Sequence, residues 1–244
     1  MPNTEQDRVV NRDRPDSGLL TTSLSTEEGT MHTVSRTRPI MGALIALGLT
    51  AVAVPAHAVQ KGDWLIRAGL GRVAPNNSSS GFSGAPTLKV EDVSNSTNLA
   101  INFTYMMTDN VGVELLGALP FKHDISVTGL GKVVETKQLP PTLILLYNFS
   151  PKSNVRPYAG AGINYTKFFG EKTKGALAGT TIDLSSSTGL AIEAGIDVDI
   201  NKDWYFNASL WSIDIDTKAR SSLVGTADVS IDPMVLFMGV GKRF

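Results

Sequence analysis

The sequence contains no cysteine among its 244 residues, and its 22 basic residues are balanced by 23 acidic ones. Without cysteine the chain has no disulfide, zinc finger, iron–sulfur cluster or thiol nucleophile. The even charge balance lacks the excess of basic residues that nucleic-acid binders need, so we expect no nucleic-acid partner. Histidine is scarce as well, with three residues. The length permits one ordinary hydrophobic domain.

Residues 31–58 carry the three parts of a secretory signal peptide: a basic start, an apolar run over residues 40–54, and small residues up to Ala58. The apolar run is shorter than the roughly 20 residues that a transmembrane helix needs. We therefore predict a signal peptide over 31–58 that is cleaved near Ala58. No later stretch of the sequence is apolar enough for a membrane-spanning helix.

The segment before the signal peptide, residues 1–30, is polar and without periodicity. It is either a disordered leader or an extension produced by a mis-assigned start codon upstream of Met31. We favour the second interpretation, because signal peptides begin at or near the translation start. The exported, mature domain is then residues 59–244.

Alternation of apolar and polar residues dominates the mature domain, in segments longer than the five or six residues of ordinary strands. It predicts eight strands, at residues 64–74, 98–108, 111–124, 134–149, 155–169, 181–200, 204–219 and 227–244. Short connections (109–110, 150–154 and 201–203) alternate with long ones (75–97, 125–133, 170–180 and 220–226). This predicts an all-β fold, an eight-stranded antiparallel up-and-down transmembrane β-barrel with short periplasmic turns and long extracellular loops.

One face of the predicted strands is wholly apolar, and we assign it to lipid. Its members include Leu99, Ile101, Phe103, Tyr105, Met107, Leu143, Leu145, Tyr147, Phe149, Leu190, Ile192, Ile196, Met234, Leu236 and Met238. A soluble barrel with its apolar face inward has the same periodicity and is the alternative. The opposite face carries Arg67, Glu114 and Glu193 deep in the strands, where buried charges need partners. These three residues predict a polar floor near the periplasmic end.

Four stretches carry a family likeness: NLAINFTYMMTDNVGVELL at 98–116, LPPTL at 139–143, RPYAGAGINY at 156–165, and Asp232-Pro233. Through them the chain resembles the outer membrane protein W family, which includes the AlkL alkane-uptake proteins. The resemblance covers essentially all of residues 64–244. It implies a monomeric, porin-like barrel of the bacterial outer membrane that binds small hydrophobic molecules and passes them across. Its implied partners are outer-membrane lipid, lipopolysaccharide and, through the terminal Phe244, the barrel-assembly machinery.

The family's narrow interior holds an apolar pocket closed from below, and the resemblance implies one here. Leu116 and Trp211 lie where the inward faces of their strands turn from polar to apolar, and they match positions that look like the family's constriction. Ile144, Leu146 and Ile213 also face inward and complete the predicted pocket. A closed floor implies lateral exit into the bilayer where ladder hydrogen bonds are missing. The candidates for such a point are Pro120, Pro140, Pro141 and Pro233.

The sequence gives only weak signals for metal binding or catalysis, and we expect no enzyme activity, cofactor or metal. The pairs Asp197/Asp199 and Asp214/Asp216 place carboxylates on one strand face, which suits calcium, but solvated carboxylates near strand ends are the favoured interpretation. A Ser-His-Asp hydrolase would need His123, which we expect to be a solvated loop residue. The alternative function is a structural or receptor barrel whose long loops bind partners or phage around an inert interior.

Overall fold

The computed structural model describes residues 58–244. The predicted leader over 1–30 and the predicted signal peptide, apart from Ala58, lie outside the described residues. Helix is limited there to one 3₁₀ turn, η1 (Gly175–Leu177). Within residues 58–244, no helix has the length and apolarity to span a bilayer.

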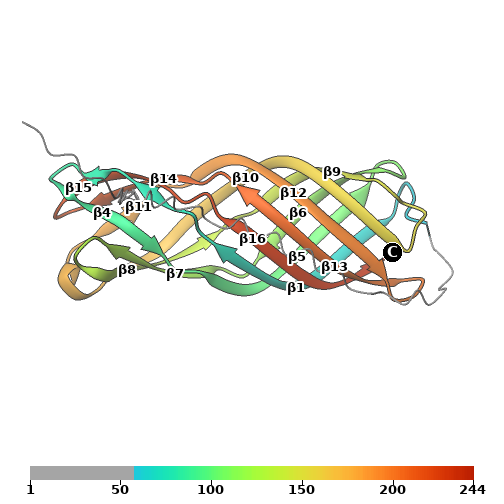
Figure 1. Cartoon of the computed structure of the whole chain (residues 1–244), viewed down its shortest axis with the longest axis horizontal. Coiled ribbons are helices and arrows are strands. Elements are labelled where there is room, and N and C mark those ends of the chain that lie inside the picture. Colours follow the sequence, from blue (N-terminus) through green and yellow to red (C-terminus); the bar gives the residue numbers. More distant parts are fainter. Residues whose placement is uncertain (1–57) are drawn as a thin grey trace, which may run out of the picture. The chain divides into compact units, whose positions relative to one another are not determined.

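Eight antiparallel strands close into a barrel, as the sequence predicts. They are β1 (Trp64–Ala74), β5 (Ser96–Met106), β6 (Val111–Ala118), β9 (Thr142–Asn148), β10 (Val155–Thr173), β12 (Ser187–Asp199), β13 (Trp204–Ile213) and β16 (Met234–Arg243). Each pairs with its neighbour in this order, and β1 also pairs with β16, which closes the wall (Figure 1). The three short connections lie at the periplasmic end, where β5, β9 and β12 pass into β6, β10 and β13.

The outer surface of these eight strands carries a continuous apolar band, with the exposed charges Arg72 and Lys167 near its extracellular edge. Leu145, Leu190 and Met238, from three different strands, are 57, 67 and 59 % exposed. A surface this apolar is not stable in water, whereas lipid is its natural solvent. Aromatic residues at the strand ends are exposed as well, and Trp64 packs on Tyr105 with 5.1 Å between ring centroids. The barrel therefore presents a lipid-facing band edged by an aromatic girdle.

Five of the predicted strands are wrong in length, because each is two strands separated by a break. The breaks separate β6 from β7 (Phe121–Val127), β8 (Gly131–Leu139) from β9, β11 (Ile182–Leu184) from β12, β13 from β14 (Asp216–Ser221), and β15 (Gly225–Ser230) from β16. Three breaks contain proline, at Pro120, Pro140-Pro141 and Pro233, which has no N–H for a ladder. Beside the last of these, Asp232 adopts a φ of +35°, outside strand geometry.

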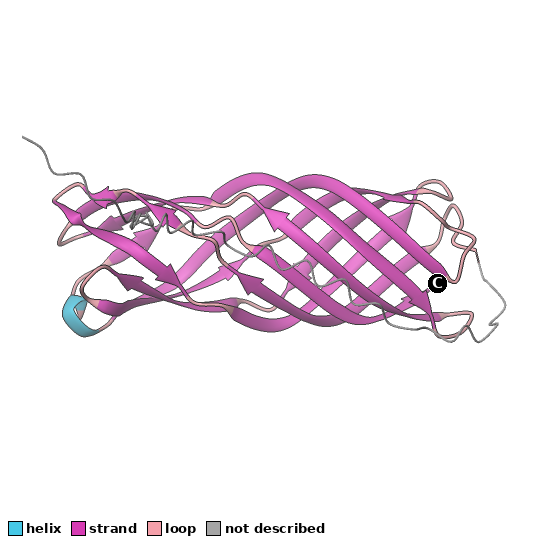
Figure 2. Cartoon of the chain, in the orientation of Figure 1, coloured by secondary structure: helices cyan, strands magenta, loops and turns pink. Residues whose placement is uncertain are grey.

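Beyond the breaks the chain forms two further sheets on the extracellular side. The predicted loop 75–97 contributes β2 (Ser78–Ser79), β3 (Gly81–Phe82) and β4 (Ala85–Val93), which the alternation did not reveal. One continues the barrel sheet from β10, in the order β10-β8-β7-β4-β3, and the other is a separate four-stranded sheet in the order β11-β14-β15-β2. Figure 2 shows these strands continuing past the ends of the barrel strands. The interior is thereby prolonged well above the lipid-facing band.

Inward glycines let the narrow barrel accommodate its interior. A Cβ on Gly162 would lie 1.8 Å from the carbonyl oxygen of Leu143, and one on Gly195 would lie 2.4 Å from Cζ of Tyr158. Any larger residue at these positions would therefore displace a strand or a tyrosine ring. The space that Gly195 leaves is what admits Tyr158 to the lower interior.

Candidate functional site

The lower interior is centred on the guanidinium group of Arg67, which is 1 % exposed. It donates from Nε and Nη2 to Oδ1 and Oδ2 of Asp197, at 3.1 and 2.9 Å. Its Nη1 donates to Oε2 of Glu114 at 2.6 Å and to Oγ1 of Thr104 at 2.8 Å. One guanidinium thus holds two buried carboxylates from opposite sides of the barrel.

Glu193, the third residue of the predicted floor, joins this group indirectly. Its Oε1 accepts a hydrogen bond from the Tyr158 hydroxyl at 3.1 Å, and the Arg67 guanidinium lies over the Tyr158 ring at 4.9 Å. Asn207 donates to the same hydroxyl at 2.9 Å and to Asp197 at 2.7 Å. The structure therefore brings Arg67, Glu114 and Glu193 into one network, with the tyrosine as the link.

Several residues of this floor have roles that the sequence interpretation gave wrongly or missed. Asp197 is not a solvated strand-end carboxylate, because it is fully buried against Arg67. Below it, Arg156 pairs with Asp199 at 2.6 Å, both side chains at most 1 % exposed. The ring of Tyr205 lies between the two arginines, 5.7 Å from Cζ of Arg67 and 5.4 Å from Cζ of Arg156. The sequence did contain a signal for both ion pairs, because the four charged residues occupy positions of their strands that face the barrel interior.

The other carboxylates considered for calcium do not form a binding site either. Asp216 accepts a hydrogen bond from the Ser230 hydroxyl and pairs with it across a ladder. Over the described part of the chain, no three histidine or acidic side chains gather into a metal-binding group.

Above the floor lies a wholly apolar space that we call the lower cavity. Its volume is about 20 Å³, room for about one water molecule. It is lined by Gly71, Val73, Ala100, Leu116, Ala118, Phe121, Pro140, Trp211, Ile213, Val235 and Phe237. Of the predicted pocket residues, Leu116, Trp211 and Ile213 line it. Ile144 and Leu146 are buried but do not, because they pair with Glu114 and Gly112 of β6 and so lie at and below the level of the floor.

The wall beside the lower cavity contains an interruption of the strand ladder. Pairing of β6 with β9 stops at Leu116 and Thr142, and pairing of β7 with β8 begins at Phe121 and Gln138. Residues 117–120 and 139–141 between these two pairs form no ladder with each other. We call this segment of the wall the ladder gap. It contains Pro120, Pro140 and Pro141.

The fourth proline candidate lies apart from the ladder gap. The break at Pro233 is bridged by backbone hydrogen bonds, from Ile213 N to Pro233 O at 3.3 Å and from Ile231 N to Ile215 O at 2.8 Å. The carboxylate of Asp232 also accepts from Ile215 N at 3.1 Å. The wall is therefore continuous at Pro233, unlike at the other three prolines.

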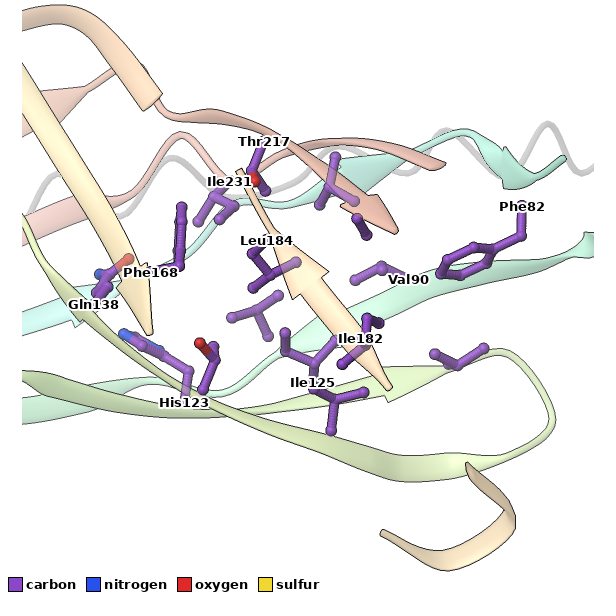
Figure 3. A pocket seen from close by; sticks show the side chains of 16 residues that line it. Phe82, Val90, His123, Ile125, Gln138, Phe168, Ile182, Leu184, Thr217 and Ile231 are labelled. Atoms are coloured by element: carbon purple, nitrogen blue, oxygen red, sulfur yellow. The ribbon is translucent and has the colours of Figure 1, made fainter. Parts of the chain in front are cut away.

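A second apolar space, the upper cavity, lies between the two extracellular sheets (Figure 3). Its volume is also about 20 Å³. It is lined by Phe82, Val90, Val93, His123, Ile125, Val127, Val134, Thr136, Gln138, Phe168, Ile182, Leu184, Thr217, Ala219, Val229 and Ile231. Phe121 and His123 are successive inward residues of β7, and they line the lower and the upper cavity respectively. The two cavities are therefore neighbours along the interior.

The expectation of a solvated His123 is wrong, because its side chain is 2 % exposed. It lies inside the extracellular sheets on β7, which the prediction joined to β6, and next to β4, which lies in a segment predicted as a loop. Its Nδ1 lies 2.6 Å from the carbonyl oxygen of Ser94. Burial lowers the pKa of His123, and the bond to Ser94 opposes this effect. A backbone carbonyl at Nδ1 is not the acidic partner that a Ser-His-Asp relay needs.

A charged cluster on the outside of the upper sheets was not foreseen. Glu135 lies 2.5 Å from Nζ of Lys174 and 2.9 Å from Nζ of Lys122. Hydrogen bonds from these two lysines lower the pKa of Glu135 to about 2, and the same contact with Glu135 raises the pKa of Lys174. The cluster joins β7, β8 and the connection before η1 above the lipid-facing band.

Comparison with known proteins places this geometry in a family. The chain is 42 % identical over 202 residues to outer membrane protein W of Escherichia coli, covering 80 % of this chain and 94 % of the relative. It is 26 % identical over 196 residues to the dibenzothiophene metabolism operon protein PahQ of Pseudomonas aeruginosa, covering 76 % and 90 %. Among solved structures, outer membrane protein OprG of Pseudomonas aeruginosa superimposes with a TM-score of 0.71 at 39 % identity, covering 78 % and 99 %.

The sequence pattern of the OmpW family matches residues 60–244, the whole of the barrel and its extracellular sheets. Relatives at this level of identity are named outer membrane proteins, and the exposed apolar band independently requires lipid around the barrel. This chain is therefore a β-barrel protein of the bacterial outer membrane and belongs to the OmpW family.

Proposed function

We propose that this barrel takes small apolar molecules from the outside and releases them sideways into the outer membrane through the ladder gap. The observation that carries the proposal is that the lower cavity, with its wholly apolar lining, directly contacts Ala118 and Pro140 of the ladder gap and Phe121 at its edge. A solute held above Leu116 and Trp211 would thus face bilayer lipid across a part of the wall that has no ladder hydrogen bonds.

The sealed floor supports the sideways direction. Straight passage to the periplasm would separate Arg67 from Asp197 and Glu114, and removing one partner from such a buried group costs several kcal/mol, about 3–5. An apolar solute offers no charge or hydrogen bond in exchange. By contrast, each Å² of the solute's apolar surface that leaves water for the lower cavity favours binding by about 25 cal/mol.

Passage requires the interior to widen, because each cavity now holds about one water. Lateral opening at the ladder gap breaks no backbone pair between residues 117–120 and 139–141, so it is the least costly place for the wall to part. The name of the relative PahQ, which refers to dibenzothiophene metabolism, associates that protein with a fused apolar aromatic. It supports an apolar cargo for this chain.

The first test is uptake of a medium-chain alkane into outer-membrane vesicles that carry the wild type, Leu116→Asp or Trp211→Ala, with vesicles lacking the protein as control. We expect uptake above the control in the wild type and a loss in Leu116→Asp, which puts a charge into the lower cavity. Equal uptake in wild-type and protein-free vesicles would contradict the proposal and favour a structural or receptor barrel whose loops bind partners or phage.

A second test closes the ladder gap directly. The chain has no cysteine, so Ala118→Cys with Pro140→Cys introduces the only two thiols, both beside the lower cavity. A short reducible linker between them should lower uptake, and reduction should restore it. The matched control joins Leu210→Cys to Leu236→Cys, which are ladder partners elsewhere in the wall. Unchanged uptake with the ladder gap linked would exclude lateral release there.

Further parts of the proposal concern assembly and partners. We propose that the protein acts as a monomer, without enzyme activity or cofactor, after removal of a signal peptide near Ala58. The band of exposed apolar residues would contact outer-membrane lipid and lipopolysaccharide. The terminal Phe244, which is 61 % exposed and paired through its backbone to Trp64, would be read by the barrel-assembly machinery.

A further inference from the structure

One polar atom of the upper cavity is left without a partner inside the protein. Within residues 58–244, Nε2 of His123 is buried and makes no hydrogen bond. Buried polar groups are satisfied in the great majority of cases, so an unpaired ring nitrogen in a cavity wall calls for an explanation. The remaining wall around it is mostly aliphatic and aromatic, with Gln138, Thr136 and Thr217 as the other polar side chains.

The chemical character of this nitrogen follows from its surroundings. The carbonyl oxygen of Ser94 only accepts hydrogen bonds, so Nδ1 at 2.6 Å from it must carry the proton. In a neutral imidazole the other nitrogen then has a free lone pair. Burial lowers the pKa of His123 and so favours the neutral ring. His123 therefore presents a hydrogen-bond acceptor, without a proton, to the upper cavity.

The position of His123 puts this acceptor on the path that the proposed function requires. His123 pairs across the ladder with Thr136, and Gln138 pairs with both Phe121 and Phe168. In Figure 3 His123 and Gln138 lie at the same end of the upper cavity. Because Phe121 lines the lower cavity, a solute moving inward would pass His123 immediately before it reaches the apolar space at the ladder gap.

We propose that the upper cavity is a recognition site for apolar molecules that carry one hydroxyl group, such as phenols and alcohols, with His123 Nε2 accepting the hydroxyl hydrogen bond. The inference rests on the proposed function and narrows its cargo. A purely hydrocarbon solute leaves Nε2 unpaired as it passes, whereas a hydroxylated one satisfies it. The site thus favours hydroxylated over plain hydrocarbon molecules of the same shape.

The test compares p-cresol with toluene, two probes that differ by one hydroxyl group. Protein extracted from outer membranes and labelled with ¹⁵N-histidine is placed in lipid nanodiscs, and its ring nitrogen spectrum is followed during titration. The His123 signals are assigned by their loss in a variant. We expect p-cresol to move the Nε2 signal towards the hydrogen-bonded position, and toluene to leave it in place. An Nε2 signal that does not respond to p-cresol overturns the inference.

Variants at His123 distinguish the loss of the hydrogen-bond acceptor from a loss of folding. In His123→Asn the side-chain amide can still donate to Ser94, while its oxygen, one bond nearer the backbone, does not occupy the position of Nε2. His123→Phe, which keeps a ring and removes both nitrogens, is the second variant should the first not assemble. The control Ile125→Val changes the same cavity without touching a polar atom. We expect uptake of p-cresol to fall about two- to tenfold in His123→Asn, as for one lost hydrogen bond, with toluene uptake unchanged.

Failure of this inference differs visibly from failure of the proposed function. If the wild type takes up toluene but the uptake of p-cresol is the same with and without His123, the barrel is a hydrocarbon passage and the inference is wrong. If wild-type vesicles take up neither probe above protein-free vesicles, the passage itself is wrong. The nitrogen titration tests the acceptor in either case, because it needs binding and not transport.

Discussion

Arg67 is the residue on which the charge balance of the lower interior depends. Its single positive charge pairs with the carboxylates of Glu114 and Asp197. Its guanidinium group also lies over the ring of Tyr158, whose hydroxyl donates to Glu193. All of these side chains are buried, so neither water nor salt screens them. Buried groups of this kind are costly when a single member is removed, because the partners remain charged and unpaired.

Replacing Arg67 should therefore destabilise the barrel strongly. We expect Arg67→Met to lower the free energy of unfolding by about 3–5 kcal/mol, measured by urea titration of tryptophan fluorescence in lipid vesicles. The control is Arg72→Met, the same substitution on the exposed face of β1, which should stay within about 0.5 kcal/mol of the wild type. Equal effects at the two positions would mean that the floor is not held by Arg67.

The external cluster at Glu135 predicts a pH dependence. The pKa of Glu135 is about 2 in the folded protein, against an ordinary value of 4.5, because Lys174 and Lys122 donate to its carboxylate. A lowered carboxyl pKa means that the stabilisation is complete above about pH 4.5 and is lost as the pH falls towards 2. Acid should thus loosen the connection between β8 and η1.

Hydrogen exchange of residues 131–139 measures this effect. Protection in the wild type should fall between pH 4.5 and pH 2, whereas Glu135→Gln should have lower protection throughout and little pH dependence. Glu91→Gln, at an exposed position of β4, is the matched control and should behave as the wild type. A wild-type profile that is flat over this range would exclude the cluster as the cause.

At the scale of the strands, proline decides where the wall is continuous. Pro120 lies on one side of the ladder gap and Pro140 and Pro141 lie on the other, so each side lacks at least one N–H donor. At Pro233 the facing segment supplies donors from Ile213 and Ile215, and the wall stays bonded. A single proline is therefore tolerated in this barrel, and prolines on both sides interrupt it.

Restoring donors at the ladder gap should close it. In Pro140→Thr/Pro141→Thr, each added hydrogen bond should disfavour the open wall about two- to tenfold, so uptake of an apolar probe should fall by that factor or more. Pro233→Thr, in a segment that is already bonded, should leave uptake unchanged. Equal uptake in all three proteins would argue that solutes leave elsewhere.

At the scale of the whole barrel, the kind of side chain on the outer surface depends on the surrounding solvent, which is lipid around the eight strands and water around the extracellular sheets. The eight strands expose leucine, isoleucine, methionine and aromatic side chains, while the extracellular sheets expose lysines such as Lys122 and Lys132. The change from one surface to the other coincides with the strand breaks. The lipid-facing band reaches the ladder gap, where Leu119 is still 53 % exposed, and the upper cavity lies beyond it.

A charge in the middle of this band should be costly. Leu145 lies halfway along β9 and is 57 % exposed, so Leu145→Arg should destabilise the barrel by about 2–4 kcal/mol in lipid vesicles. Lys137→Arg, on the exposed face of β8 beyond the break, should have no measurable effect. The comparison is made by urea unfolding, and a neutral Leu145→Arg would contradict the assignment of this face to lipid.

The barrel itself was predictable from sequence because a strand in a lipid-bounded wall has one apolar and one inward face at every step. The bounds of β1 are those predicted, and the lipid-facing positions Leu99, Leu143 and Leu190 are exposed as expected. Alternation continues across Pro120 and Pro140, however, so it could not reveal that the strands break there and pair anew. The extracellular sheets consequently went unpredicted.

Sequence alone thus determined the membrane-facing surface, the closed barrel and the inward direction of Arg67, Glu114 and Trp211, because these depend on local parity. Only the tertiary structure decided which inward groups meet: Arg67 with Asp197, Glu193 with Tyr158, and His123 with the backbone of Ser94. Such partners lie up to 130 positions apart in the chain. The register of the strands around the barrel brings them together, and that register leaves no signal in the local pattern.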